Sequence, residues 1–186
     1  MRRGVRIGIG VGVVAGLLAA GAWLWEAFAE EGHPFGDARA CEGSDIPLQV
    51  ALDVLRLPLP AGAKDVHYVT HASKPMRTVT LTVAFRVSGK TLDRYLRKTG
   101  IVPAGVDWLT NGPYATGDVG SDPATLGLCG GEKQIVAPSV YIDKRRNALD
   151  GSPQGQVFDF AVALPDGYGK IPTMTDVLLT AAGNNP

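Results

Sequence analysis

The sequence contains two cysteines, Cys41 and Cys129, which are its most direct candidates for covalent chemistry. Both follow a charged N-terminus and a long apolar segment, so we expect them on the exported side of a membrane, where thiols oxidise and stay oxidised. We therefore predict a disulfide between them. It would close a separation of 88 residues, for which chain-entropy models give about 4 to 5 kcal/mol before native-state strain is subtracted.

The alternative for the two cysteines is a pair of free thiols or a metal site. No C-x-x-C spacing is present, and the chain has only three histidines, His33, His67 and His71. His67 and His71 would share one face of a helix, but their segment is rich in β-forming residues, and in a strand they would lie about 13 Å apart. One ion cannot bridge that distance, so the sequence predicts no metal site and no cofactor.

Motifs for catalysis and phosphate binding are missing from the sequence of the outer domain. It has no G-x-S-x-G, S-x-x-K or H-E-x-x-H, and no glycine-rich phosphate loop. The glycine-rich stretch 111–131 offers only Asp118 and Asp122 as carboxylates, too few for an EF-type calcium loop. Lys144, Arg145 and Arg146 form a basic cluster that we expect in a solvated turn. These observations favour a non-catalytic protein.

Alternating apolar and polar residues predict the strands. Segment 78–87 gives the clearest pattern, because its apolar residues all fall on one face, namely Val79, Leu81, Val83, Phe85 and Val87. Further strands are expected at 65–71, 136–143, 156–164 and 176–181. Segment 144–155 has the polar, glycine-containing character of a hairpin connection, and Pro165-Asp166-Gly167 supplies a turn, which favours antiparallel pairing.

Helical spacing is weaker and occurs in two places. Residues 92–99 repeat apolar side chains at helical intervals, and Gly100 supplies a stop signal. Segment 46–57 is apolar enough to form either a short helix or a strand. The pattern therefore predicts an α+β domain, loop-rich, in which an antiparallel sheet carries one or two helices on one face.

An apolar segment near the N-terminus determines the expected topology. Residues 7–25 carry no charge and would reach about 28 Å as a helix, close to the thickness of the lipid core. Three arginines precede the segment and three glutamates follow it, so the N-terminus is expected in the cytoplasm. We predict a cytoplasmic tail at 1–6, a single transmembrane helix at 7–25, a linker at 26–45 and an extracytoplasmic domain at 46–182.

Cleavage of this segment is the alternative. Ala27-Phe28-Ala29 and Ala20-Gly21-Ala22 both have the small-x-small pattern of a signal-peptide cleavage site, and cleavage would give a secreted protein. The apolar run is longer than a usual signal core, which favours an uncleaved anchor in the cell membrane.

Glycines recur every fourth residue in the predicted span. Gly8, Gly12 and Gly16 form overlapping G-x-x-x-G motifs, which let membrane helices approach closely. We predict that this stripe supports self-association or contact with a partner transmembrane helix. The alternative is a composition rich in small residues with no contact role.

The run Leu57–Tyr68, LPLPAGAKDVHY, together with the arginine-flanked anchor, resembles uncharacterised exported or membrane-anchored proteins of high-GC actinobacteria over about residues 55 to 100. The resemblance implies no activity. With 18 basic and 18 acidic side chains, no net charge attracts nucleic acid. We expect a membrane-tethered extracytoplasmic binding or scaffolding protein of the cell envelope. The alternatives are an envelope enzyme, which needs a pocket of clustered polar groups, or a regulator acting through a partner transmembrane helix.

Overall fold

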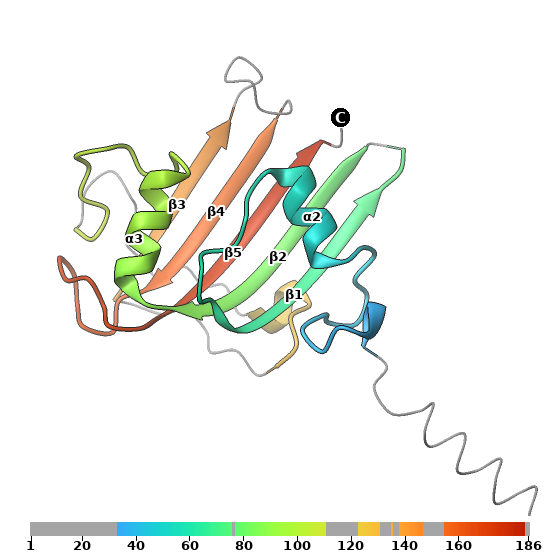
Figure 1. Ribbon diagram of the computed structural model, residues 1–186, viewed down its shortest axis with the longest axis horizontal. Coiled ribbons are helices and arrows are strands. Elements are labelled where there is room, and N and C mark those ends of the chain that lie inside the picture. Colours follow the sequence, from blue (N-terminus) through green and yellow to red (C-terminus); the bar gives the residue numbers. More distant parts are fainter. Residues whose placement is uncertain are drawn as a thin grey trace, which may run out of the picture. The chain divides into compact units, whose positions relative to one another are not determined.

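The computed structural model describes residues 33–75, 77–110, 123–130, 135, 138–146 and 155–184. They form an α+β domain with a five-stranded antiparallel sheet and two α-helices (Figure 1). The predicted tail 1–6, the span 7–25 and its glycines Gly8, Gly12 and Gly16 lie outside the described residues. Within the described ranges, no helix has the length and apolar character needed to cross a bilayer.

The sheet combines two hairpins on either side of a central strand. In chain order the strands are β1 (Lys64–Ser73), β2 (Thr78–Val87), β3 (Ser139–Arg146), β4 (Gln156–Ala163) and β5 (Thr175–Asn184). Their order across the sheet is β1-β2-β5-β4-β3, and every neighbouring pair is antiparallel. The predicted antiparallel sheet is therefore confirmed, and the predicted strand 78–87 coincides with β2.

Strand β3 corrects the prediction for the basic cluster. The structure extends the strand to Arg146, so Lys144, Arg145 and Arg146 do not form a solvated turn. The guanidinium carbon of Arg146 lies 4.9 Å from the centre of the Phe158 ring, and its Nη2 donates to the carbonyl of Thr99 at 2.8 Å. An arginine can pack its long stem against an apolar surface while its charge keeps a partner. The charge pattern alone therefore misplaced the end of the strand.

Helix α2 (Leu48–Leu55) resolves the ambiguous segment 46–57 as helical. Its buried residues, Leu48, Ala51, Leu52 and Leu55, have the spacing of one helical face. Gln156 Nε2 donates to the carbonyl of Leu55 at 3.1 Å, which satisfies one of the groups that a helix end leaves open. Gly183 lies opposite on β5, where a Cβ would stand 3.0 Å from the Leu55 side chain, so this glycine lets the helix approach the sheet.

Helix α3 (Gly89–Lys98) confirms the predicted helix at 92–99 and begins three residues earlier. The hydroxyl of Ser88 caps it by accepting from the backbone N–H of Thr91 at 3.3 Å. The ring of Tyr95 meets that of Phe160 edge-on, with centroids 6.4 Å apart. Both helices thus lie on one face of the sheet (Figure 1).

The opposite face carries a second, smaller cluster of buried side chains. Its members are Cys41, Val69, Ala84, Leu128, Ile135, Ala161 and Leu178, with Cys129 and Ala163 packed against them. Successive residues of a strand point to opposite faces, so each strand contributes its alternate residues here. We call this set the disulfide cluster. The short 3₁₀ helix η2 (Pro123–Leu126) immediately precedes its Leu128 and Cys129.

Candidate functional site

The segment that enters the domain is bonded to the outer edge of β1. Ala40 forms a parallel bridge with Tyr68. The N–H of Tyr68 donates to the carbonyl of Arg39 at 2.9 Å, and the N–H of Cys41 donates to the carbonyl of Tyr68 at 2.8 Å. Strand β1 is an edge strand, so these bonds cover groups that would otherwise be open to pairing. The last part of the expected linker 26–45 therefore lies against the sheet.

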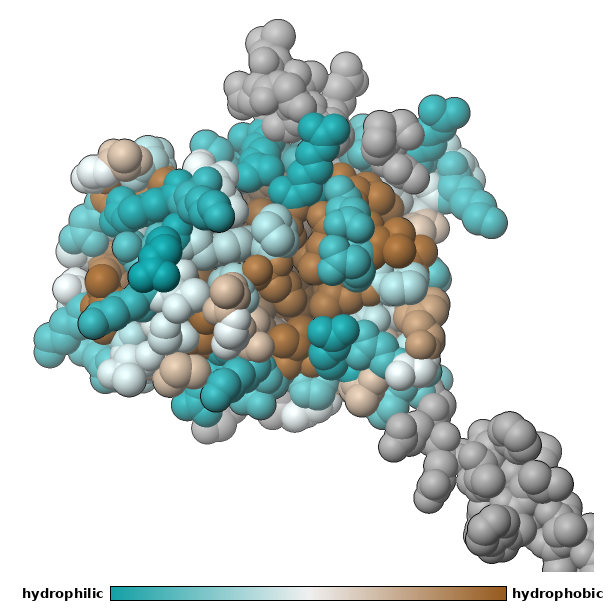
Figure 2. Space-filling view, in the orientation of Figure 1, coloured by the Kyte–Doolittle hydropathy of each residue, from teal (hydrophilic) through white to brown (hydrophobic). Residues whose placement is uncertain are grey.

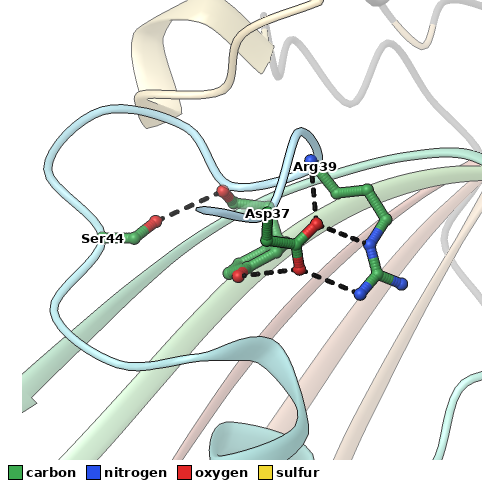
Figure 3. Close-up of polar contacts among 4 residues, drawn as sticks. Asp37, Arg39 and Ser44 are labelled. Atoms are coloured by element: carbon green, nitrogen blue, oxygen red, sulfur yellow. Dashed lines mark hydrogen bonds and ion pairs between the residues drawn. The ribbon is translucent and has the colours of Figure 1, made fainter. Parts of the chain in front are cut away.

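A carboxylate fixes the side chain of Arg39 at this edge (Figure 3). Asp37 accepts from Arg39 Nε and Nη2, both at 2.9 Å, and from the hydroxyl of Tyr68 at 3.3 Å. Paired bonds of this kind define the orientation of an arginine. The hydrogen bonds from Arg39 hold the pKa of Asp37 at about 2, below its usual value. Arg39 is thus presented in one orientation, with its side chain about half exposed.

Beside Arg39 lies a hollow of about 310 Å³. It is lined by Arg39, Leu48, Gln49, Leu52, Pro58 and Leu59. Leu48 and Leu52 are buried and give it an apolar floor, whereas Arg39 and Gln49 give it a polar margin. Small-molecule sites usually occupy about 300 to 1,000 Å³, so this hollow is at the small end of that range. Its size suits an apolar side chain of a partner better than a whole cofactor.

Further apolar side chains are exposed or half-buried on α2 and on the segment after it, where Pro58 and Leu59 also line the hollow. Val50 is 46% exposed, Pro58 is exposed, and Val54 and Leu59 are half-buried. Figure 2 shows hydrophobic surface gathered over α2 and the segment that follows it. Val50 is the exposed apolar residue of the helix, and Val54, four residues later, is half-buried and also packs against the core. We call these four residues and the hollow the α2 patch.

The sequence carries a signal for the α2 patch in the number of its apolar residues. A helix on one face of a sheet needs a single apolar stripe, and Leu48, Ala51, Leu52 and Leu55 already provide it. Val50 is an apolar residue in excess of that stripe, and Val54 lies at its margin. This excess also explains why the segment could not be assigned to helix or strand from its pattern.

The predicted disulfide is present, and it joins the incoming segment to the segment after η2. Cys41 and Cys129 are bonded, with their Cα atoms 5.4 Å apart, and Cys41 is 2% exposed. His67 lies next to the bond, with Nδ1 3.9 Å from the sulfur of Cys129. His71 is on the same strand but lies beside Asp45, with Nδ1 3.7 Å from the carboxylate.

Sequence reasoning missed the proximity of His67 to the cysteines. The spacing argument considered only the distance between His67 and His71. The metal-binding neighbour of His67 is Cys41, which lies 26 residues earlier in the chain. Cys41 and His67 are close because Ala40 pairs with Tyr68. This bridge brings the two side chains together on the face of the sheet opposite the helices. No local sequence pattern predicts a bridge between residues so far apart in the chain.

Two other places in the described domain bring polar side chains together. The hydroxyl of Tyr141 donates to Asp159 at 2.6 Å, and burial raises the pKa of this tyrosine. A wide depression of about 720 Å³ along α3 is open to solvent and lined mostly by basic side chains. Its only carboxylate, that of Asp93, accepts from Arg97 and from the indole of Trp108. Neither place combines a nucleophile with a free acid or base, as catalysis requires.

Comparison of the chain with protein-family models, with curated proteins and with solved structures finds no match. The geometry of the α2 patch and of the disulfide cluster is therefore the basis for interpreting the site.

Proposed function

We propose that this chain is a membrane-tethered, non-catalytic binding or scaffolding protein of the cell envelope, and that it holds a partner protein at the α2 patch. The observation that carries the proposal is the exposed apolar face of α2 next to a hollow with an oriented arginine. An envelope enzyme would instead need a pocket of convergent polar groups. Exposed, continuous apolar surface is typical of interaction sites.

The composition of the α2 patch favours a protein segment as its ligand. Val50, Val54, Pro58 and Leu59 form an apolar centre, and Gln49, Asp53 and Arg56 are exposed polar residues of the same segment. Protein interfaces commonly have an apolar centre with a polar margin, and arginine is enriched among the residues that contribute most to their affinity. Because Asp37 already orients Arg39, a partner would not have to order that side chain on binding.

The proposed location rests on the N-terminal sequence and on the redox chemistry. By the positive-inside rule, the arginines before residues 7–25 support a location of the following chain outside the cytoplasm, and a disulfide is typical of that oxidising environment. An anchor at 7–25 would keep the patch near the membrane and raise its effective concentration for membrane partners. The intact mass of the membrane-bound protein tests the anchor, since cleavage after Ala29 or Ala22 removes it.

Site-specific cross-linking tests the proposed partner. A photo-reactive amino acid at Gln49, an exposed residue that lines the hollow, is introduced into the full chain in cells that naturally make it. We expect one discrete protein adduct at this position. The same group at Arg145, an exposed residue on the other face of the sheet, should give no such adduct.

A second substitution shows whether the adduct depends on the apolar surface. Val50→Asp places a charge at the centre of the α2 patch and should remove the adduct at position 49. Val50 is half exposed, so its replacement should leave the melting temperature nearly unchanged. An adduct that survives Val50→Asp, or an equal adduct at position 145, contradicts the proposal.

A further inference from the structure

Three side chains that bind soft metal ions meet in the disulfide cluster. The sulfurs of Cys41 and Cys129 and a ring nitrogen of His67 all lie within 4.8 Å of one another. Cys41 is buried, while His67 and Cys129 are half-buried, so the group is partly shielded from solvent. This set differs from the pair His67 and His71, which the sequence excluded as a joint metal site.

Contacts other than the disulfide bond also hold the two cysteines near His67. The backbone N–H of Cys41 donates to the carbonyl of Tyr68 at 2.8 Å, and Tyr68 is the residue after His67. Leu128, the residue before Cys129, is buried in the disulfide cluster. These contacts do not depend on the bond between the sulfurs.

We propose that reduction of the Cys41–Cys129 disulfide creates a zinc site in which the two thiolates and His67 are the protein ligands. Zinc binds sulfur at about 2.3 Å and imidazole nitrogen at about 2.0 Å, and in a tetrahedron these lengths separate the ligand atoms by roughly 3.5 to 4 Å. His67 Nδ1 already lies 3.9 Å from the sulfur of Cys129, and all three ligand atoms lie within 4.8 Å of one another. The two sulfurs are bonded to each other in this structure, so after reduction they must move apart to reach the spacing of zinc ligands. Three protein ligands would leave one position for water or another ligand.

The proposed zinc site forms only after the disulfide is reduced, and a dithiol can act as the reductant. The dithiol gives two electrons and two protons to the disulfide, becomes a disulfide itself and leaves two cysteine thiols. Binding of Zn²⁺ then releases those two protons as the thiolates coordinate. The bonded sulfurs cannot serve as thiolates, so the oxidised protein lacks two of the three ligands.

The test is zinc titration of the full chain in detergent, with a chromophoric chelator as competitor and a phosphine as reductant in the reduced sample. We expect one Zn²⁺ per reduced chain and at least a 100-fold weaker affinity in the oxidised chain. Co²⁺ in the same sample should show thiolate-to-metal charge-transfer absorption. Equal affinity in the two redox states overturns the proposal.

Two histidine variants distinguish this site from zinc held by cysteines of an unfolded chain. His67→Ala keeps both cysteines and should weaken zinc binding by at least about tenfold, in line with the loss caused by altering a metal's surroundings. His71→Ala is the matched control, because His71 lies on the same strand and the same face, and it should bind as the unaltered chain does. If the two variants bind zinc equally well, the proposal is wrong.

Discussion

The two faces of the sheet are stabilised in different ways. The face under the helices buries large side chains, among them Trp108, Tyr68, Phe158 and Phe160, and α2 and α3 lie against it. The disulfide cluster on the other face contains three alanines and no aromatic residue, and a covalent bond joins the segments that carry Cys41 and Cys129. Small side chains bury little apolar area. The comparison indicates that one face is held mainly by packing, and the other depends on a cross-link.

Removing the cross-link should have the largest effect. The double substitution Cys41→Ala and Cys129→Ala deletes a bond across 88 residues and is expected to lower the free energy of unfolding by about 4 kcal/mol. The measurement is denaturant unfolding of the oxidised protein and the double variant. A loss below about 1 kcal/mol would show that packing alone holds the second face, and the contrast between the faces would not stand.

Two consecutive leucines on β5 provide the sharpest comparison of packing. Leu179 is fully buried under the helices, whereas Leu178 is buried in the disulfide cluster. We expect Leu179→Ala to cost about 4 kcal/mol and Leu178→Ala about 2.5 kcal/mol, because the cavity term is larger in the more tightly filled core. Urea unfolding of both variants measures the difference. Equal losses would mean that the two faces are equally well packed.

Two consecutive arginines on β3 extend the comparison to charged residues. Arg146 lies over the Phe158 ring and donates to the carbonyl of Thr99, so Arg146→Ala should cost about 1.5 kcal/mol. Arg145 points to the other face, where it is exposed and 3.9 Å from Asp143. Its replacement by alanine should cost less than about 0.5 kcal/mol. Thermal unfolding of the two variants decides whether the order holds.

The smallest expected effect is the loss of stability in acid that comes from Asp37, which lies at the β1 edge of the sheet. The folded-state pKa of Asp37 is about 2, below the unfolded value of 3.8, so its contribution is complete above pH 4 and is lost as the pH falls toward 2. Because solvent screens this pair, we expect at most about 1 kcal/mol. Unfolding curves between pH 2 and pH 6 should therefore show a steeper acid loss in the unaltered chain than in Asp37→Asn. If stability falls equally with pH in the unaltered chain and in Asp37→Asn, the acid sensitivity comes from other groups.

Most of the sheet could be predicted from the sequence, because alternation is a local signal. Strand β2 has its five apolar residues on the buried face, as the pattern required. Strand β3 could not be bounded in the same way, since the environment of Arg146 depends on Phe158 and Thr99, which are distant in the sequence. Helix α2 stayed ambiguous because its apolar residues serve two surfaces, the sheet and the exposed patch.

The candidate sites depended on contacts that lie far apart in the chain. The disulfide could be predicted from the number of cysteines and their expected compartment. The position of His67 beside it could not, because that follows from the pairing of residue 40 with residue 68. Arg39 likewise lies beside the hollow because its segment runs along β1, although Asp37, which orients its side chain, is only two residues away.

The disulfide also has a mechanical consequence for a domain attached through its N-terminus. A pulling force that enters along the chain meets the bonds of residues 37–41 to β1 and then, at Cys41, a covalent link to Cys129. While the link is intact, the 88-residue stretch between the cysteines cannot be drawn out. Reduction would release it and add about 300 Å of extensible chain, at about 3.4 Å per residue. In a protein anchored as proposed, the redox state of this one bond would set the maximum length of the tether under load.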